Sequence, residues 1–297
     1  MPSAEYERLL KKIRSLPPIF GEDVVEQRQA MDKIVEFFPI GEDVVREETD
    51  AGGVPAEWLN PETASGDGVL LYLHGGGYCI GSMTSHRHMI ANIARAAGVR
   101  ALSIEYRLCP EHPFPAGLED AVTAYHWLVE EGTPPKSIVI AGDSAGGGLT
   151  LATLLKLRED GFAQPAGAVL ISPWTDLTSS GESIKTRAAV DPILNPDRTT
   201  HLADWYADGA DVTQPLISPL FADLRGLPPL FVQVGGAEIL LDDSTRLAQA
   251  AREQGLDVEL EIWDDMFHVW HFYADWIPEG REAIDKIADF MSAKLAG

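Results

Sequence analysis

Short apolar runs recur along the chain from residue 44 onward, and polar stretches with glycine and proline separate them. Eight of these runs predict β-strands, at residues 44–47, 54–59, 69–73, 101–104, 137–140, 167–171, 229–234 and 258–263. Several are continuously apolar, which is typical of strands buried on both faces. Apolar positions at helical spacing between the later runs predict helices at residues 87–97, 116–130, 148–158 and 244–254. The alternation predicts an α/β fold with a mostly parallel, eight-stranded sheet flanked by helices.

Two segments outside this alternation are predicted to be helical. The first carries apolar positions at helical spacing from Leu9 to Leu16, and a second helical run follows a Pro-Pro break, at residues 31–38. The other segment, residues 178–214, has a helical pattern that two prolines interrupt. We expect it to be an insertion over the carboxyl edge of the sheet, within a catalytic domain of residues 46–297. It would pack with the helices of residues 1–45 as a helical cap.

The charge of the chain limits its partners. Its 297 residues carry 46 acidic and 23 basic side chains, a formal net charge of −23 at pH 7. Such a chain repels nucleic acid phosphates and anionic lipids, so neither nucleic acid nor membrane is an expected partner. No apolar run approaches the length of a membrane span, and the polar, amphipathic start shows no secretory signal. We therefore expect a cytoplasmic protein.

The sequence contains no pattern that predicts a metal site. Cys79 and Cys109 are too few for a disulfide framework and lack metal-ligand spacing, so we expect small buried side chains. His86 and His88 lie two residues apart, but no third and fourth ligand accompanies them at suitable spacing.

The first candidate for chemistry is a serine in a glycine cluster. Residues 142–146 read Gly-Asp-Ser-Ala-Gly, directly after an apolar strand and before a helical run. This G-x-S-x-G pattern places its serine, Ser144, on a strained turn with the hydroxyl above the sheet, as a nucleophile. A glycine-rich turn with a helix-capping serine would give the same letters. A phosphate loop fits poorly because no Gly-Lys-Ser/Thr follows, and a dinucleotide site fails on spacing.

A second glycine cluster follows an earlier strand. Residues 74–77 read His-Gly-Gly-Gly, and acyl transfer needs N–H donors aimed at the oxygen that gains charge. We expect backbone donors from Gly75, Gly76 and Gly77, and from Ala145 after the serine. The alternative is a tight loop without chemistry. For His74 itself we favour a structural role that pins this loop.

Both clusters resemble the signatures of the hormone-sensitive-lipase-like branch of the α/β-hydrolase esterases. The segments 105–121 and 218–235 are also similar to that family, so the resemblance runs from about residue 44 to the C-terminus. It implies an α/β-hydrolase fold and hydrolysis of carboxylic esters with short to medium acyl chains, through an acyl-enzyme and without a cofactor. It also implies pairing through the last strand, so a homodimer is expected.

The general base must lie downstream in the chain order nucleophile, acid, histidine. Three histidines follow the serine: His201 in the predicted insertion, and His268 and His271 after the last strand. His268 lies where α/β-hydrolases place their histidine loop, so it is the predicted base. We expect His271 to be a packing or surface residue.

The acid is predicted from the motif register. The family pattern after the seventh strand is Asp-x-Leu-x-Asp, and this chain reads Glu-Ile-Leu-Leu-Asp from Glu238 to Asp242. Glu238 therefore occupies the triad position, and either carboxylate can hold an imidazole Nδ1–H. Asp242 is the reserve candidate and Asp243 a third, since both could instead charge the first turn of the next helix.

Residues near these motifs, or in the predicted insertion, are further candidates for supporting roles. Asp143, beside the nucleophile, is expected to make structural hydrogen bonds. Tyr78, Trp205 and Tyr206 are candidate walls of the substrate pocket, although aromatic residues there could equally pack in the core or the cap.

Two other functions compete with ester hydrolysis. An amidase, deacetylase or lactonase would use the same machinery on another leaving group. A noncatalytic ligand receptor of this fold is disfavoured, because such receptors lose the histidine that is present here.

Overall fold

The computed structural model describes residues 1–15 and 23–296. Its centre is an eight-stranded sheet with the strand order β1-β2-β4-β3-β5-β6-β7-β8. β1 pairs with β2, and β2 with β4, in antiparallel fashion; all other neighbours are parallel. The strands are β1 (Val44–Asp50), β2 (Pro55–Pro61), β3 (Val69–Leu73), β4 (Arg100–Ile104), β5 (Ile138–Asp143), β6 (Gly167–Ile171), β7 (Leu230–Gly235) and β8 (Val258–Trp263).

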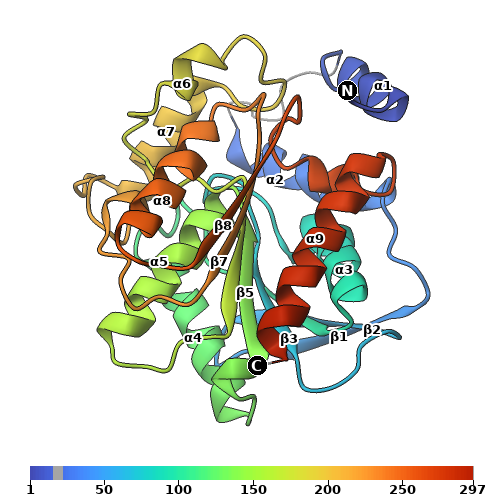
Figure 1. Ribbon diagram of the computed structural model, residues 1–297, viewed down its shortest axis with the longest axis vertical. Helices are drawn as coiled ribbons and strands as arrows, with labels where there is room; N and C mark the ends of the chain where they lie inside the picture. The colour runs from blue at the N-terminus through green and yellow to red at the C-terminus, as the bar shows by residue number, and fades with distance from the viewer. Residues whose placement is uncertain (16–22, 297) are drawn as a thin grey trace.

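Helices cover both faces of this sheet (Figure 1). α4 (Ala116–Glu130), α5 (Ala145–Glu159) and α8 (Leu241–Glu253) lie on one face, and α3 (Met83–Ala97) and α9 (Pro278–Leu295) on the other. Every residue of β3, β5, β6 and β7 is consequently buried. Each large aliphatic side chain removed from water there contributes about 1.5–3 kcal/mol. The continuous apolar runs of the sequence are thus explained by two-sided burial.

The remaining helices lie in the upper half of the view in Figure 1, and the C-terminus lies at the opposite end. They are α1 (Ala4–Ile13), α2 (Val24–Asp32), α6 (Ser183–Thr186) and α7 (Pro196–Ala207). Short 3₁₀ turns include η1 (Lys33–Glu36) and η4 (Trp270–Tyr273). Among the described residues, every helix is too short or too polar to cross a bilayer.

The predicted α/β fold with its eight strands is confirmed. Several element ends differ, and α9 lies outside the predicted helix ranges. α3 begins four residues before the predicted start because Ser82 and Ser85 form a capping box. The helix expected at residues 31–38 is wrong in its bounds. Asp23 accepts the N–H groups of Val25 and Glu26, so the helix begins there and gives way to η1. Leu16 and the Pro-Pro break lie outside the described residues.

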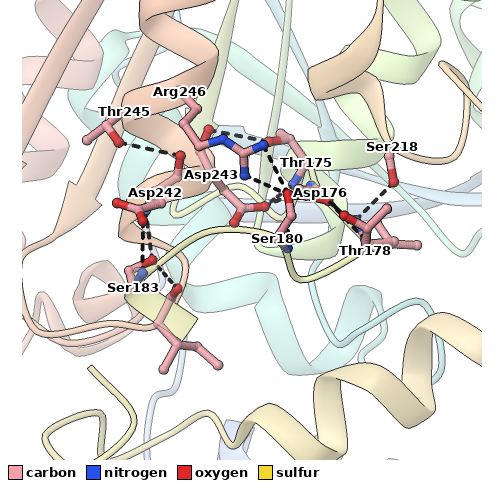
Figure 2. Close-up of polar contacts among 12 residues, drawn as sticks. Thr175, Asp176, Thr178, Ser180, Ser183, Ser218, Asp242, Asp243, Thr245 and Arg246 are labelled. Carbon is pink, nitrogen blue, oxygen red and sulfur yellow. Dashed lines mark hydrogen bonds and ion pairs between the residues drawn. The ribbon is translucent and has the colours of Figure 1, made fainter. Parts of the chain in front are cut away.

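The start of the inserted segment is joined to α8 by acidic side chains (Figure 2). Asp243 Oδ1 accepts the N–H groups of Asp176 and of the residue before it, each at 2.8 Å. Arg246 donates to Asp176 Oδ2 at 2.7 Å. Asp242 accepts the N–H of Ser183 at 2.8 Å. These bonds hold the loop after β6 against the first turn of α8.

Candidate active site

The site lies where the strand order reverses. β3 has β4 on one side and β5 on the other, so the loops after β3 and β5 leave toward opposite faces and open a crevice between them. The Gly75–Gly77 loop follows β3, and Ser144 follows β5. In a parallel sheet such a crevice outside the carboxyl ends of the strands is the expected place for a ligand.

Ser144 sits on a strained turn between β5 and α5. Its φ of 54° and ψ of −122° lie in a backbone region that residues other than glycine rarely adopt. The flanking glycines give the turn its clearance: a Cβ on Gly142 would lie 2.3 Å from the carbonyl oxygen of Gly146. A Cβ on Gly146 would lie 2.0 Å from the carbonyl oxygen of Leu73. The prediction that both glycines provide clearance around the serine is confirmed.

Three predicted side chains form one hydrogen-bonded chain. His268 Nε2 lies 2.9 Å from Ser144 Oγ, although 124 residues separate the two in sequence. His268 Nδ1 lies 2.6 Å from Glu238 Oε2. All three side chains are buried. The arrangement can carry a proton from a hydroxyl to an imidazole whose tautomer a carboxylate holds.

The other oxygen of Glu238 is also held. Its Oε1 accepts the Ser172 hydroxyl at 2.7 Å and the Gly235 N–H at 2.6 Å. The Ser172 Oγ in turn accepts the N–H of Val269, the residue after His268. These contacts fix the longer glutamate side chain at a position where the family pattern has aspartate. Sequence reasoning missed Ser172, because nothing in its local pattern marks it.

The competing candidates lie away from this chain of hydrogen bonds. Asp242 and Asp243 bind backbone N–H groups after β6, as described above. His271 is buried, and its Nε2 lies 2.8 Å from Gln233 Oε1. His201 packs its ring on Trp205 at a centroid distance of 4.4 Å.

The environment of His268 favours its charged form. Burial lowers the pKa of the imidazole, but the Glu238 carboxylate raises it by its charge and its hydrogen bond. Asp191 and Asp143 raise it further by their charges. The net result is a pKa above the usual value for histidine, as expected for a base that must hold a proton during the reaction.

The glycine loop after β3 presents free N–H groups beside Ser144. Within the described part of the chain, the N–H groups of Gly76 and Gly77 have no acceptor. Gly75 differs from the expectation, because its N–H already donates to Asp143 Oδ1 at 3.0 Å. Ala145 is the first residue of α5, where backbone N–H groups have no partner inside the helix.

Asp143 and His74 support this loop. Asp143 is buried and accepts the Tyr72 hydroxyl at 2.9 Å as well as the Gly75 N–H. The carbonyl of His74 accepts the Tyr106 hydroxyl at 2.7 Å, and its ring stacks on Tyr106. Both residues have the structural contacts that were expected of them.

Known proteins match the chain along most of its length. The family model described as "alpha/beta hydrolase fold" matches residues 70–272. An acetyl-hydrolase of Streptomyces hygroscopicus is 46% identical over 274 residues, covering 91% of this chain and 90% of the relative. A crystal structure of an esterase from the bacterial hormone-sensitive lipase family has a TM-score of 0.95 at 46% identity, covering 99% of both chains. The chain is an α/β-hydrolase of the hormone-sensitive lipase family.

A second solved structure is similar to the hydrolase. Crystals of EstE5 that were soaked with p-nitrophenyl butyrate contain a chain 44% identical to the hydrolase. Its TM-score is 0.95, and the match covers 99% of the hydrolase and 100% of EstE5.

A cavity of about 90 Å³ opens beside Ser144 and His268. Its remaining lining comes from segments far apart in sequence: Met31, Gly76, Ile80, His86, Asp143, Ile193, Leu194, Val269, Phe272 and Tyr273. The predicted walls Tyr78, Trp205 and Tyr206 do not line it. Tyr78 and Tyr206 are buried and stack on each other at a centroid distance of 3.7 Å. They pack α7 against the loop after β3, and packing was the alternative that the sequence left open.

The described residues of the hydrolase contain no cluster of three or more side chains that could hold a metal ion. Cys79 and Cys109 are free thiols, both buried, with their Sγ atoms 2.7 Å apart. They occupy the core as the sequence predicts.

Proposed function

We propose that this hydrolase, an ester hydrolase by its family, cleaves short-chain carboxylic esters through an acyl-enzyme on Ser144. The observation that supports this most strongly is the hydrogen-bonded chain of Ser144, His268 and Glu238 beside two free N–H groups. No cofactor takes part in the proposed chemistry.

In the proposed mechanism, Ser144 Oγ attacks the ester carbonyl carbon while His268 Nε2 takes the hydroxyl proton. Glu238 stabilises the imidazolium that forms. The tetrahedral intermediate then collapses, and His268 gives its proton to the departing alkoxide. Water, activated by His268, repeats the sequence on the acyl-enzyme and releases the carboxylic acid.

The negative oxygen of each intermediate would accept hydrogen bonds from Gly76, Gly77 and Ala145. Gly75 is left out of this set because Asp143 already accepts its N–H. The N-terminus of α5 adds a partial positive charge at the same point. Each such donor contributes about 3–4 kcal/mol of transition-state stabilisation.

The size of the cavity supports a small acyl group. At about 90 Å³ it is smaller than a cavity of roughly 150 Å³, which holds a benzene molecule. The Streptomyces relative bears the name acetyl-hydrolase, which agrees with an acyl group of this size. We propose that acetate and butyrate esters are preferred over longer ones.

We propose that residues 1–45 and 178–214 form a cap over this cavity. Met31 of α2, and Ile193 and Leu194 before α7, line the cavity. Tyr6 of α1 stacks on Phe267, the neighbour of His268. The catalytic domain of residues 46–297, in which residues 178–214 are inserted, would carry the triad.

We also propose that the hydrolase forms a homodimer and resides in the cytoplasm. β8 is an edge strand of the sheet and leaves Ile262 exposed, so it could pair with β8 of a second copy. Gel filtration at the mass of one chain would contradict the dimer.

A series of p-nitrophenyl esters from acetate to palmitate tests the proposed function. We expect wild-type kcat/KM to be highest for acetate or butyrate and to fall for longer chains. Ser144→Ala should lose at least about 10³-fold, because the nucleophile is gone. Full activity in Ser144→Ala, or no activity of the wild type on any ester, would refute the proposal.

A further inference from the structure

Asp191 lies in the inserted segment between α6 and α7 and makes three hydrogen bonds with backbone N–H groups. Its Oδ1 accepts the N–H groups of Ile193 and Leu194, both at 2.9 Å. Its Oδ2 accepts the N–H of Ile239, also at 2.9 Å and 48 residues away in sequence.

The two oxygens of this carboxylate accept hydrogen bonds from different parts of the site. Ile193 and Leu194 line the cavity beside Ser144. Ile239 directly follows Glu238, the proposed acid. A single side chain therefore joins a wall of the cavity to the loop that carries the acid, and a shift of either would be transmitted to the other.

The charge of Asp191 also reaches His268. Across the described ranges 1–15 and 23–296, no arginine or lysine forms an ion pair with Asp191. Burial raises the pKa of the Asp191 carboxyl, and the charge of His268 is the largest opposing effect. The other ionisable groups that face His268 are Glu238, Asp143 at the end of β5, and His271 in η4.

We propose that Asp191 is a positioning residue for ester hydrolysis, which holds the Ile193–Leu194 wall in register with the Glu238 loop. The proposal rests on the proposed role of Glu238. Asp211, another aspartate of the insertion, closes only a local turn. It is exposed and accepts the N–H of Thr213 at 2.9 Å.

The test compares Asp191→Ala and Asp191→Asn with the matched control Asp211→Ala. The readouts are kcat and KM for acetate and hexanoate esters, the pH profile of kcat/KM, and the thermal unfolding midpoint. We expect Asp191→Ala to lose about 10- to 100-fold in kcat/KM, the cost of a small misplacement of reacting groups. The ratio of kcat/KM for hexanoate to kcat/KM for acetate should rise at least about threefold, because the Ile193–Leu194 wall is no longer held in place.

The pH profile separates positioning from simple loss of structure. The base must be unprotonated to act, so kcat/KM falls as the pH drops through the pKa of His268. Without the negative charge of residue 191 the imidazolium is less stable, so the acid limb should move to lower pH. Asp191→Asn keeps an oxygen for Ile193 and Leu194 but loses the charge, so it should show this shift with a smaller change in chain-length ratio.

The outcomes are distinct. Asp211→Ala should stay within about twofold of wild type in every readout. The proposal fails if Asp191→Ala stays within twofold as well. It also fails if activity and unfolding midpoint fall together while the acid limb and the chain-length ratio stay unchanged. Failure of the proposed function would look different: Ser144→Ala would stay active, while the Asp191 variants would still change the chain-length ratio.

Discussion

Glu238 is held by more contacts than its interaction with His268 alone requires. Ser172 and Gly235 bind one carboxylate oxygen, so the other is turned toward the imidazole. Asp242 lies only four residues further on, but its carboxylate binds the N–H of Ser183. Two carboxylates that are close in sequence therefore have separate environments.

This difference predicts unequal effects of two alanine substitutions. Glu238→Ala should lower kcat for p-nitrophenyl butyrate by about 10³- to 10⁴-fold, because His268 loses the group that holds its tautomer. Asp242→Ala should lower kcat by less than about tenfold. Its main effect should be a lower thermal unfolding midpoint, because the N–H of Ser183 loses its acceptor. The reverse order in steady-state kinetics would transfer the acid role to Asp242.

At the scale of elements, the contact between the loop after β6 and α8 contains a buried carboxyl with a raised pKa, that of Asp243. Asp243 is fully enclosed, and burial raises its pKa to about 8, although the N–H groups of Thr175 and Asp176 oppose this. The neighbouring charge of Asp176 raises the pKa further, while Arg246 lowers it. Figure 2 shows these side chains around one another.

The raised pKa of Asp243 predicts how stability depends on pH. The folded state keeps this proton up to about pH 8, whereas an unfolded aspartate loses it near pH 4. Over that window the folded state binds more protons, so this carboxyl lowers the free energy of unfolding as the pH rises. Asp243→Asn should flatten the dependence in urea unfolding at pH 5, 7 and 9. Asp211→Asn, a control at an exposed carboxylate, should keep the wild-type slope; an unchanged slope in Asp243→Asn would contradict the prediction.

At the scale of the whole molecule, the charge of −23 acts against the compact state. Like charges on one surface repel each other, and salt shortens the range of that repulsion from about 10 Å at 0.1 M to about 3 Å at 1 M.

We therefore expect added NaCl to raise the thermal midpoint of the hydrolase at pH 7.5. At pH 5, close to the isoelectric point of about 4.6, the same addition should have a much smaller effect. Differential scanning calorimetry at low and high NaCl measures both. An equal rise at both pH values would show that screening of the net charge is not the cause.

The sequence by itself determined the eight strands, the helices between them and the order of the proposed triad. These features depend on neighbours within a few residues: apolar periodicity, glycine clearance around Ser144, and the place of His268 after the last strand. Glu238 could be chosen over Asp242 from motif register alone.

Only the tertiary structure decided which side chains surround the substrate. The cavity wall combines Met31, Ile193 and Phe272, and no local pattern predicts which of many apolar residues will meet there. No local pattern predicts that Asp143 accepts the N–H of Gly75. Nor does any local pattern predict that Asp191 accepts a backbone N–H from a loop 48 residues away. Such contacts follow from how whole segments pack around the sheet, whereas the signals that a sequence displays are local.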